Sequence, residues 1–112
     1  LDNVGDVNKA CLDGKGKLLS CKKLSQGSAD CTALSVRQVV ENALLSGASA
    51  VVLAHNHPSG VALPSESDRA VTLWVRDALK TMDIRLLDHI IVADDDFVSM
   101  AQSGYLTSWE HL

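Results

Sequence analysis

The apolar run SAVVLA at positions 49–54 constrains the fold of this chain more than any other segment. It carries no charge, and only Ser49 in it is polar, which is the pattern of a short β-strand buried on both faces. A helical pattern precedes the run and a second one follows it. Such a strand requires helices that pack against its sheet, so the run predicts a layered α/β domain.

The segments at 35–47 and 65–82 carry apolar residues at helical spacing, and each begins with a capping box. In the second segment this box is the pair Ser65 and Asp68. Trp74 belongs to the apolar stripe of the second helix, so we expect its ring to lie in the core.

The remaining segments read as strands. Residues 7–13 and 17–24 form a predicted hairpin, and residues 84–93 form a second one with 97–100. The small polar stretch at 25–33 is predicted to be a loop. The order of two strands, a helix, a strand, a helix and two strands predicts one sheet with helices packed against it.

Composition narrows the class of protein. With 112 residues, 46% of them hydrophobic and 21% charged, the chain has the size and balance of one globular domain over 1–112. No apolar run approaches the roughly 20 residues of a membrane span. The net charge of −4 argues against a dedicated nucleic-acid binder. Because the chain begins with Leu1, we expect it to be a fragment of a longer protein.

Lysines and cysteines carry weaker signals. Half of the basic residues fall in the first hairpin, where we expect them to form one solvated face. They are Lys9, Lys15, Lys17, Lys22 and Lys23. The three cysteines, an odd number without a CxxC spacing, are expected to be buried reduced thiols. We therefore expect a cytoplasmic protein.

The chemistry of the chain is concentrated in AHNHPSG at 54–60 and in Asp68. Side chains at i and i+2 of a strand point the same way, so His55 and His57 can face one point. The connection to the second helix is long enough to bring Asp68 to the same point. Two imidazoles and one carboxylate leave a tetrahedral zinc ion one open position, which is typical of hydrolytic rather than structural sites. The alternative is a turn with two polar histidines beside an ordinary helix cap.

Three other signals are weaker. The letters HNH also name a nuclease class, but Asn56 lies between the histidines on the opposite side of an extended backbone. A zinc deaminase would need a glutamate after its His-x and a downstream PCxxC, and the chain has neither. Asp88 and His89 are adjacent in a strand and face opposite ways, so we expect His89 to be structural or to support the site from behind.

The spacing His-x-His, seven residues, Ser, two residues, Asp resembles the JAMM motif of the MPN-type metallopeptidases. The segments VRQVVENALLSGASAVVLAHNHPSG, PSESD and IRLLDHIIVADDDFVSM resemble the JAB-type domain of the bacterial RadC family, from about Cys11 to about Leu106. The resemblance implies a fold related to the cytidine deaminases, with a mixed β-sheet between flanking helices. It also implies a helix-hairpin-helix region ahead of the domain in the parent protein.

The resemblance implies roles for individual residues. Zinc would be bound by His55, His57 and Asp68, and Ser65 would help to hold the oxyanion. The glutamate that moves protons in the family is expected seven residues before Leu12, where this chain has Gly5.

Three readings of this departure are open. Asp6 takes the role through a β-bulge, or another acid such as Glu66 does, or the site binds metal and turns over poorly.

Two functions follow as expectations. The first is a zinc-dependent hydrolase that cleaves a peptide or isopeptide-like amide. The second is a metal-binding, weakly active or non-catalytic interaction module, linked through its parent protein to DNA-associated processes. We expect no membrane and no nucleic-acid partner for this domain alone. The domain could pair as a homodimer through exposed strands. Substrate specificity would come from the loops at 25–33 and 58–64.

Overall fold

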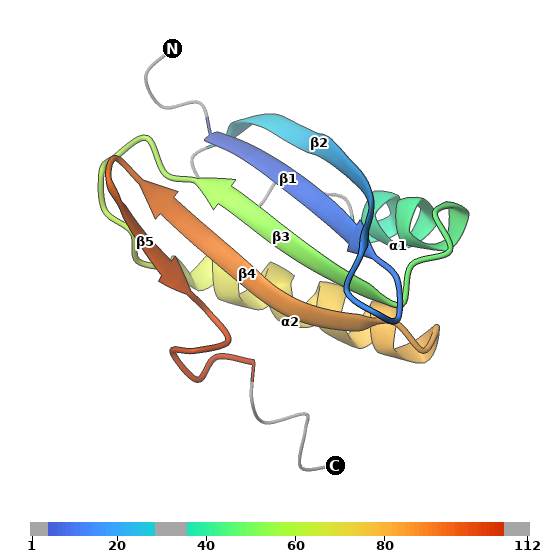
Figure 1. The fold of residues 1–112 in the computed structure, drawn as a ribbon. Coiled ribbons are helices and arrows are strands. Elements are labelled where there is room, and N and C mark those ends of the chain that lie inside the picture. The colour runs from blue at the N-terminus through green and yellow to red at the C-terminus, as the bar shows by residue number, and fades with distance from the viewer. Residues whose placement is uncertain (1–4, 29–35, 107–112) are drawn as a thin grey trace.

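The computed structural model describes residues 5–28 and 36–106. Its elements form a five-stranded sheet in the order β2-β1-β3-β4-β5, with two helices (Figure 1). In chain order they are β1 (Gly5–Leu12), β2 (Leu18–Ser28), α1 (Val36–Leu45), β3 (Ala50–Asn56), α2 (Glu66–Thr81), β4 (Arg85–Ala93) and β5 (Asp96–Ser99).

The sheet is mixed. β1 runs antiparallel to both β2 and β3, β3 runs parallel to β4, and β5 returns antiparallel to β4. The predicted order of elements and the predicted α/β class with a mixed sheet are therefore confirmed.

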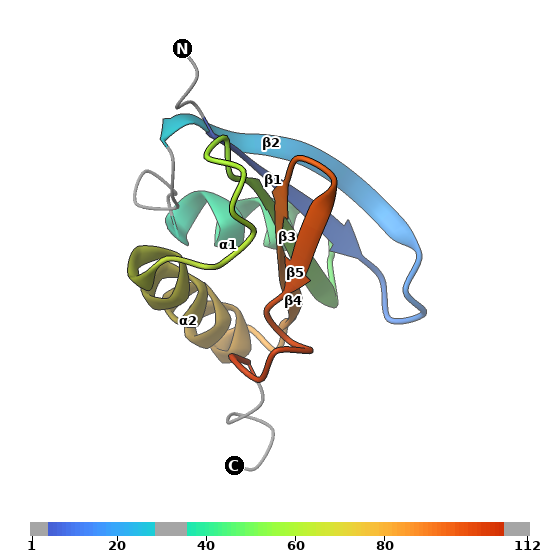
Figure 2. The ribbon, with the colours of Figure 1, turned by 90° about the vertical axis from the view of Figure 1, so that its left-hand side faces the viewer.

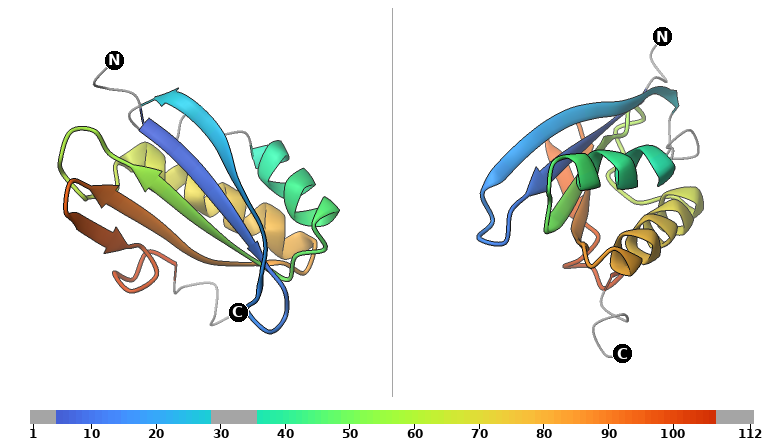
Figure 3. Two further views of the ribbon diagram at one scale, coloured as in Figure 1. Left: turned by 45° about the horizontal axis from the view of Figure 1, so that its top comes forward. Right: turned by 90° about the vertical axis from the view of Figure 1, so that its right-hand side faces the viewer.

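Both helices cover the same face of the sheet, as the side views show (Figures 2 and 3). The resemblance implied a sheet between helices, and the described residues differ from that arrangement. The reason is topological. β2 and β3 are parallel, and so are β3 and β4, so α1 and α2 are both crossover connections that advance in one direction along the sheet. Right-handed crossovers that advance in one direction place their helices on one face.

The core lies between this face and the helices. Alternate residues of β1 and β3 are completely buried there, among them Val7, Cys11, Val51 and Leu53. Their neighbours on the other face, such as Val52 and Ala54, are only half-buried. The expectation that 49–54 is buried on both faces is therefore wrong for the second face, which carries no helix in the described part of the chain.

Two residues lie in the opposite environment to the one predicted. Lys9, expected in a solvated hairpin, is 0% exposed, because its side chain points to the same helix-covered face of β1 as those of Val7 and Cys11. Trp74, expected in the core, is 63% exposed, because the face of α2 that packs on the sheet is instead formed by residues such as Val71 and Val75.

β2 is longer than predicted. The polar segment expected to be a loop from residue 25 continues as strand to Ser28, because Gly5 and Asp6 pair with Ser28 and Gln26. Of the cysteines expected to be buried, Cys11 is buried, Cys21 is exposed, and Cys31 lies outside the described residues. Among the described residues, neither helix is long and apolar enough to cross a lipid bilayer.

Candidate metal centre

Two neighbouring elements bring three potential ligands together. His55 is the penultimate residue of β3, His57 directly follows the strand, and Asp68 lies in the first turn of α2. One ligand atom from each residue falls in a group whose members lie within 4.8 Å of one another, and all three residues are buried. The structure thus brings together the three residues predicted as zinc ligands.

The loop after β3 fixes the orientation of His57. Its backbone N–H donates to the carbonyl of Val92 on β4 at 2.7 Å, and Nδ1 lies 3.0 Å from the carbonyl oxygen of Val61. Because a carbonyl oxygen can only accept, we assign the Nδ1 proton to this hydrogen bond. In a neutral ring Nε2 then carries a lone pair, which is the arrangement that metal-binding histidines adopt.

The carboxylate of Asp68 takes part in the capping box of α2 and also contacts both histidines. Its Oδ2 accepts the backbone N–H of Ser65 at 2.8 Å and lies 2.9 Å from Nε2 of His57, while Oδ1 lies 3.3 Å from Nδ1 of His55. The capping box predicted for α2 is confirmed. A lone pair and a carboxylate oxygen at 2.9 Å repel each other unless a positive charge, a proton or a metal ion, lies between them.

The donor set and its spacing fit a zinc ion. In a tetrahedral zinc site with bonds of about 2.0 Å, neighbouring ligand atoms are about 3.3 Å apart, so a contraction of at most about 1.5 Å brings a pair that lies within 4.8 Å to that separation. Two imidazoles and one carboxylate leave one position for water or substrate. The buried surroundings and the Nδ1 hydrogen bond of His57 supply the supporting contacts that such sites need.

Ser65 is the N-cap of α2 and lies beside Asp68. Its Oγ accepts the backbone N–H of Asp68 at 3.0 Å and lies 3.4 Å from Oγ of Ser67. The cap uses only a lone pair of Ser65, so its hydroxyl proton can be donated elsewhere. The position therefore suits a donor to a developing oxyanion, and this role stays a prediction.

His89 lies behind the site on β4 and is fully buried. Its ring centroid is 6.0 Å from that of His55. Burial, followed by the nearby His55, lowers the pKa of His89 to about 4, although Asp68 and Asp88 oppose the shift. His89 is therefore neutral at pH 7.

The start of β1 bears on the missing glutamate. An extra residue interrupts the β1–β2 ladder between Gly5 and Asp6, but it belongs to β2, because Gly5 pairs with Ser28 and Asp6 with Gln26. Asp6 and Val7 then pair with consecutive residues of β2. The β1 backbone thus lacks the bulge that the Asp6 hypothesis requires at this step. The side chain of Asp6 lies outside the described part, and its catalytic role stays a prediction.

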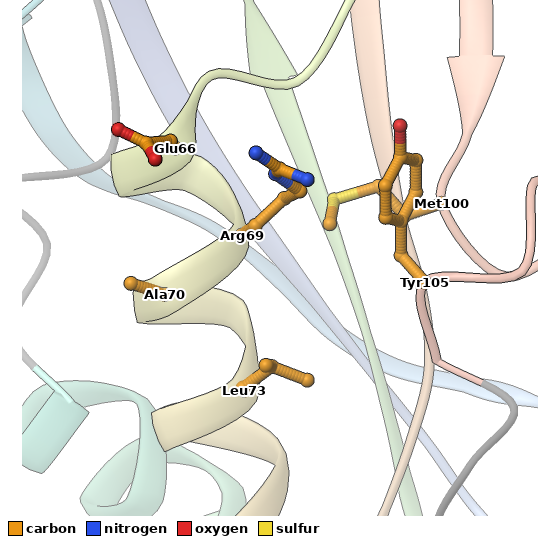
Figure 4. Close-up of a pocket in the computed structure, with 6 residues that line it drawn as sticks. All are labelled: Glu66, Arg69, Ala70, Leu73, Met100 and Tyr105. Atoms are coloured by element: carbon orange, nitrogen blue, oxygen red, sulfur yellow. The ribbon is translucent and has the colours of Figure 1, made fainter.

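A pocket of about 470 Å³ opens between α2 and the turn after β5 (Figure 4). The guanidinium of Arg69 lies 5.6 Å from the ring centroid of Tyr105, and Met100 lies beside them. The other lining residues are Glu66, Ala70 and Leu73. Glu66, the alternative acid, is exposed and points away from Arg69.

Sequence reasoning placed specificity in two loops and missed this pocket. Its residues come from an exposed stripe of α2 and from a turn near the end of the described chain, and only the tertiary fold brings them together. Sequence reasoning also missed Val61 and Thr72, which hold His57 and Asp68. The i,i+4 spacing of Asp68 and Thr72 was the available signal for the second contact.

Comparison with known sequences identifies the family. The sequence model of the RadC-like JAB domain matches residues 5–105. A UPF0758 protein of Alcanivorax borkumensis is 47% identical over 97 residues, which cover 85% of this chain and 43% of that protein. A UPF0758 protein of Thioalkalivibrio sulfidiphilus is 48% identical over 99 residues, covering 87% and 44%. This chain thus spans less than half the length of these relatives, and it belongs to the RadC-like JAB domain family.

Proposed function

We propose that this domain is a zinc-dependent hydrolase of the JAMM type, which cleaves a peptide or isopeptide-like amide bond. The observation that carries the proposal is the 2.9 Å approach of Nε2 of His57 to Oδ2 of Asp68, with Nδ1 of the same ring committed to the carbonyl of Val61. This geometry leaves a lone pair and a carboxylate aimed at one buried position, which favours a cation there.

The residues divide the work of hydrolysis. A zinc ion bound by two imidazoles and a carboxylate would supply Lewis acidity and would lower the pKa of a bound water to about 7. His55 would hold the ion from β3, His57 from the residue that directly follows β3, and Asp68 from the first turn of α2. Ser65 would donate a hydrogen bond from its hydroxyl group, whose lone pair caps α2, to the carbonyl oxygen on which negative charge develops.

Amide hydrolysis also requires a carboxylate side chain that first takes a proton from the attacking water as a general base and then gives it to the leaving amine as a general acid. The family position for this acid is Gly5, which cannot perform the step. We retain Asp6 as the candidate on this chain. Glu66 is less suited, because it faces solvent at the pocket rather than the metal centre.

The glycine at position 5 supports a second candidate function, a metal-binding module that contributes an interaction surface rather than turnover. Within residues 5–28 and 36–106, β2 and β5 are the edge strands of the sheet, and their outer sides would be the places for a partner protein or a second copy of the chain to pair. The net charge of −4 disfavours nucleic acid as the direct ligand, so a link to DNA-associated processes would run through the parent protein.

The metal and the reaction are tested separately. We expect the purified protein to bind one zinc per chain, measured by elemental analysis after dialysis, and His57→Ala to bind none. Wild-type zinc content below about one tenth of an ion per chain, unchanged by added zinc, would refute the metal site.

The zinc-loaded protein is then assayed with a panel of peptide and isopeptide amides, beside Gly5→Glu and His57→Ala. Hydrolysis that Gly5→Glu raises and His57→Ala abolishes supports the enzyme. Zinc binding without hydrolysis in either the wild type or Gly5→Glu supports the interaction module. Cytoplasmic location and homodimer formation belong to the same proposal and are checked by fractionation and by sedimentation.

A further inference from the structure

A buried chain of polar groups lies behind the metal centre and is not used in the proposed reaction. Oγ1 of Thr72, in the second turn of α2, lies 2.5 Å from the carbonyl oxygen of Asp68. Oγ1 of Thr72 also lies 2.6 Å from Nδ1 of His89 on β4. All three residues are 0% exposed.

The direction of these hydrogen bonds follows from the groups involved. The carbonyl of Asp68 can only accept, so the single hydroxyl proton of Thr72 points to it. The 2.6 Å contact is then a hydrogen bond only if Nδ1 of His89 donates to Oγ1. The chain therefore runs from His89 through Thr72 to the backbone of the proposed ligand Asp68, and it assigns the Nδ1–H tautomer to His89.

A threonine hydroxyl that bonds the carbonyl four residues earlier is common in helices and needs no function. What distinguishes Thr72 is the second bond, because it joins α2 to β4 at the height of Asp68. β4 also accepts the backbone N–H of His57 through Val92. In addition, β4 pairs with β3 through Leu53 and His89, two residues before His55. β4 contributes no proposed ligand itself, but it contacts α2, β3 and the residue after β3, which carry the three proposed ligands.

We propose that Thr72 and His89 are positioning residues that hold the first turn of α2 on β4, so that Asp68 meets the two histidines at one metal ion. This inference rests on the proposed metal site and adds the residues that keep it assembled. Outer contacts of this kind typically change metal affinity by 10- to 100-fold.

The test measures zinc affinity by competition with a chromophoric chelator. We expect Thr72→Val, which has the same shape without the hydroxyl, to weaken zinc binding about 10-fold or more. Thr72→Ser, which keeps the hydroxyl, should restore it. His89→Leu should weaken binding similarly, and His89→Asn, whose amide N–H can occupy the place of Nδ1–H, should recover most of it.

Two further measurements separate positioning from general destabilisation. Val75→Ala lies one turn further along α2 and is equally buried, so it should lower stability in urea without changing zinc affinity. In Co²⁺-loaded protein, Thr72→Val should alter the visible absorption bands that report coordination geometry, whereas Val75→Ala should not.

The outcomes distinguish the two proposals. If the wild type does not bind zinc, the proposed function fails. If the wild type binds zinc, and Thr72→Val binds it equally well with an unchanged Co²⁺ spectrum, the positioning role is wrong and the metal site stands. Equal weakening by Thr72→Val and Val75→Ala would also overturn the inference.

Discussion

The carbonyl oxygen of Val61 lies 3.0 Å from Nδ1 of His57, so the loop that leaves β3 folds back onto the histidine at its start. The backbone N–H of Gly60 donates a hydrogen bond to the carbonyl of His57 at 3.3 Å and closes the turn. The loop therefore fixes the orientation of the His57 ring and of its ligand atom Nε2, so substitutions in the loop should change the metal affinity of the site.

Gly60 is the residue on which this loop depends. Its φ of +84° is strained for any residue with a side chain, and an added Cβ would lie 2.8 Å from Oδ2 of Asp94. We expect Gly60→Ala to lower the free energy of unfolding by about 1–3 kcal/mol and to weaken zinc binding, because Val61 is displaced. Urea denaturation and zinc competition measure the two effects.

Gly16→Ala is the matched control for this prediction. Gly16 has a similar φ of +82°, nothing lies within 4 Å of its Cβ position, and it is remote from the site. Its substitution should cost about 1 kcal/mol through backbone strain alone. A Gly60→Ala protein with unchanged zinc affinity would contradict the coupling of loop and ligand.

The carboxylate of Asp68 should matter more to the metal than to the helix. In Asp68→Asn an amide oxygen can still accept from the backbone of Ser65, so circular dichroism should show the helical content retained. Loss of the negative ligand should weaken zinc binding at least about 100-fold by chelator competition. Asp77→Asn, an exposed acid on the same helix, should bind zinc like the wild type. Similar affinities for the two variants would exclude Asp68 as a ligand.

The lowered pKa of His89 makes the metal-free protein sensitive to acid. The folded value of about 4 is below the unfolded value of 6.5, so the unfolded chain binds more protons between these limits. The contribution of His89 is complete above about pH 6.5 and is lost as the pH falls towards 4. We expect wild-type stability to fall by about 3 kcal/mol more than that of His89→Asn between pH 7 and pH 4. Urea unfolding in the presence of chelator measures this, and parallel pH profiles of the two proteins would refute it.

Lys9 buries its ammonium group in the core, and its Nζ has no hydrogen-bond partner among the described residues. Burial of a charged group without an acceptor is unfavourable. Lys9→Met keeps the unbranched stem and removes the charge, so we expect the free energy of unfolding to rise by about 1–3 kcal/mol, measured in urea. The exposed Lys17→Met should change it by less than about 0.5 kcal/mol. A destabilised Lys9→Met would show that the ammonium has a favourable contact in the folded protein.

Local patterns in the sequence determined the elements and the pieces of the site. Apolar residues at a spacing of 3.6 located both helices, and an uninterrupted apolar run located β3. The His-x-His spacing and the capping box named His55, His57 and Asp68, which the structure brings together. These predictions need only the geometry of one segment and a connection long enough to return.

Only the tertiary structure decided which faces are covered and what stands behind the site. Alternation shows that Lys9 shares a face with Val7, but it does not show that both crossovers place a helix over that face. The exposed side of α2 at Trp74 and the bond from His89 to Thr72 likewise depend on how distant segments pack. The physical reason is that burial and second contacts belong to pairs of elements, whereas a sequence pattern describes one element at a time.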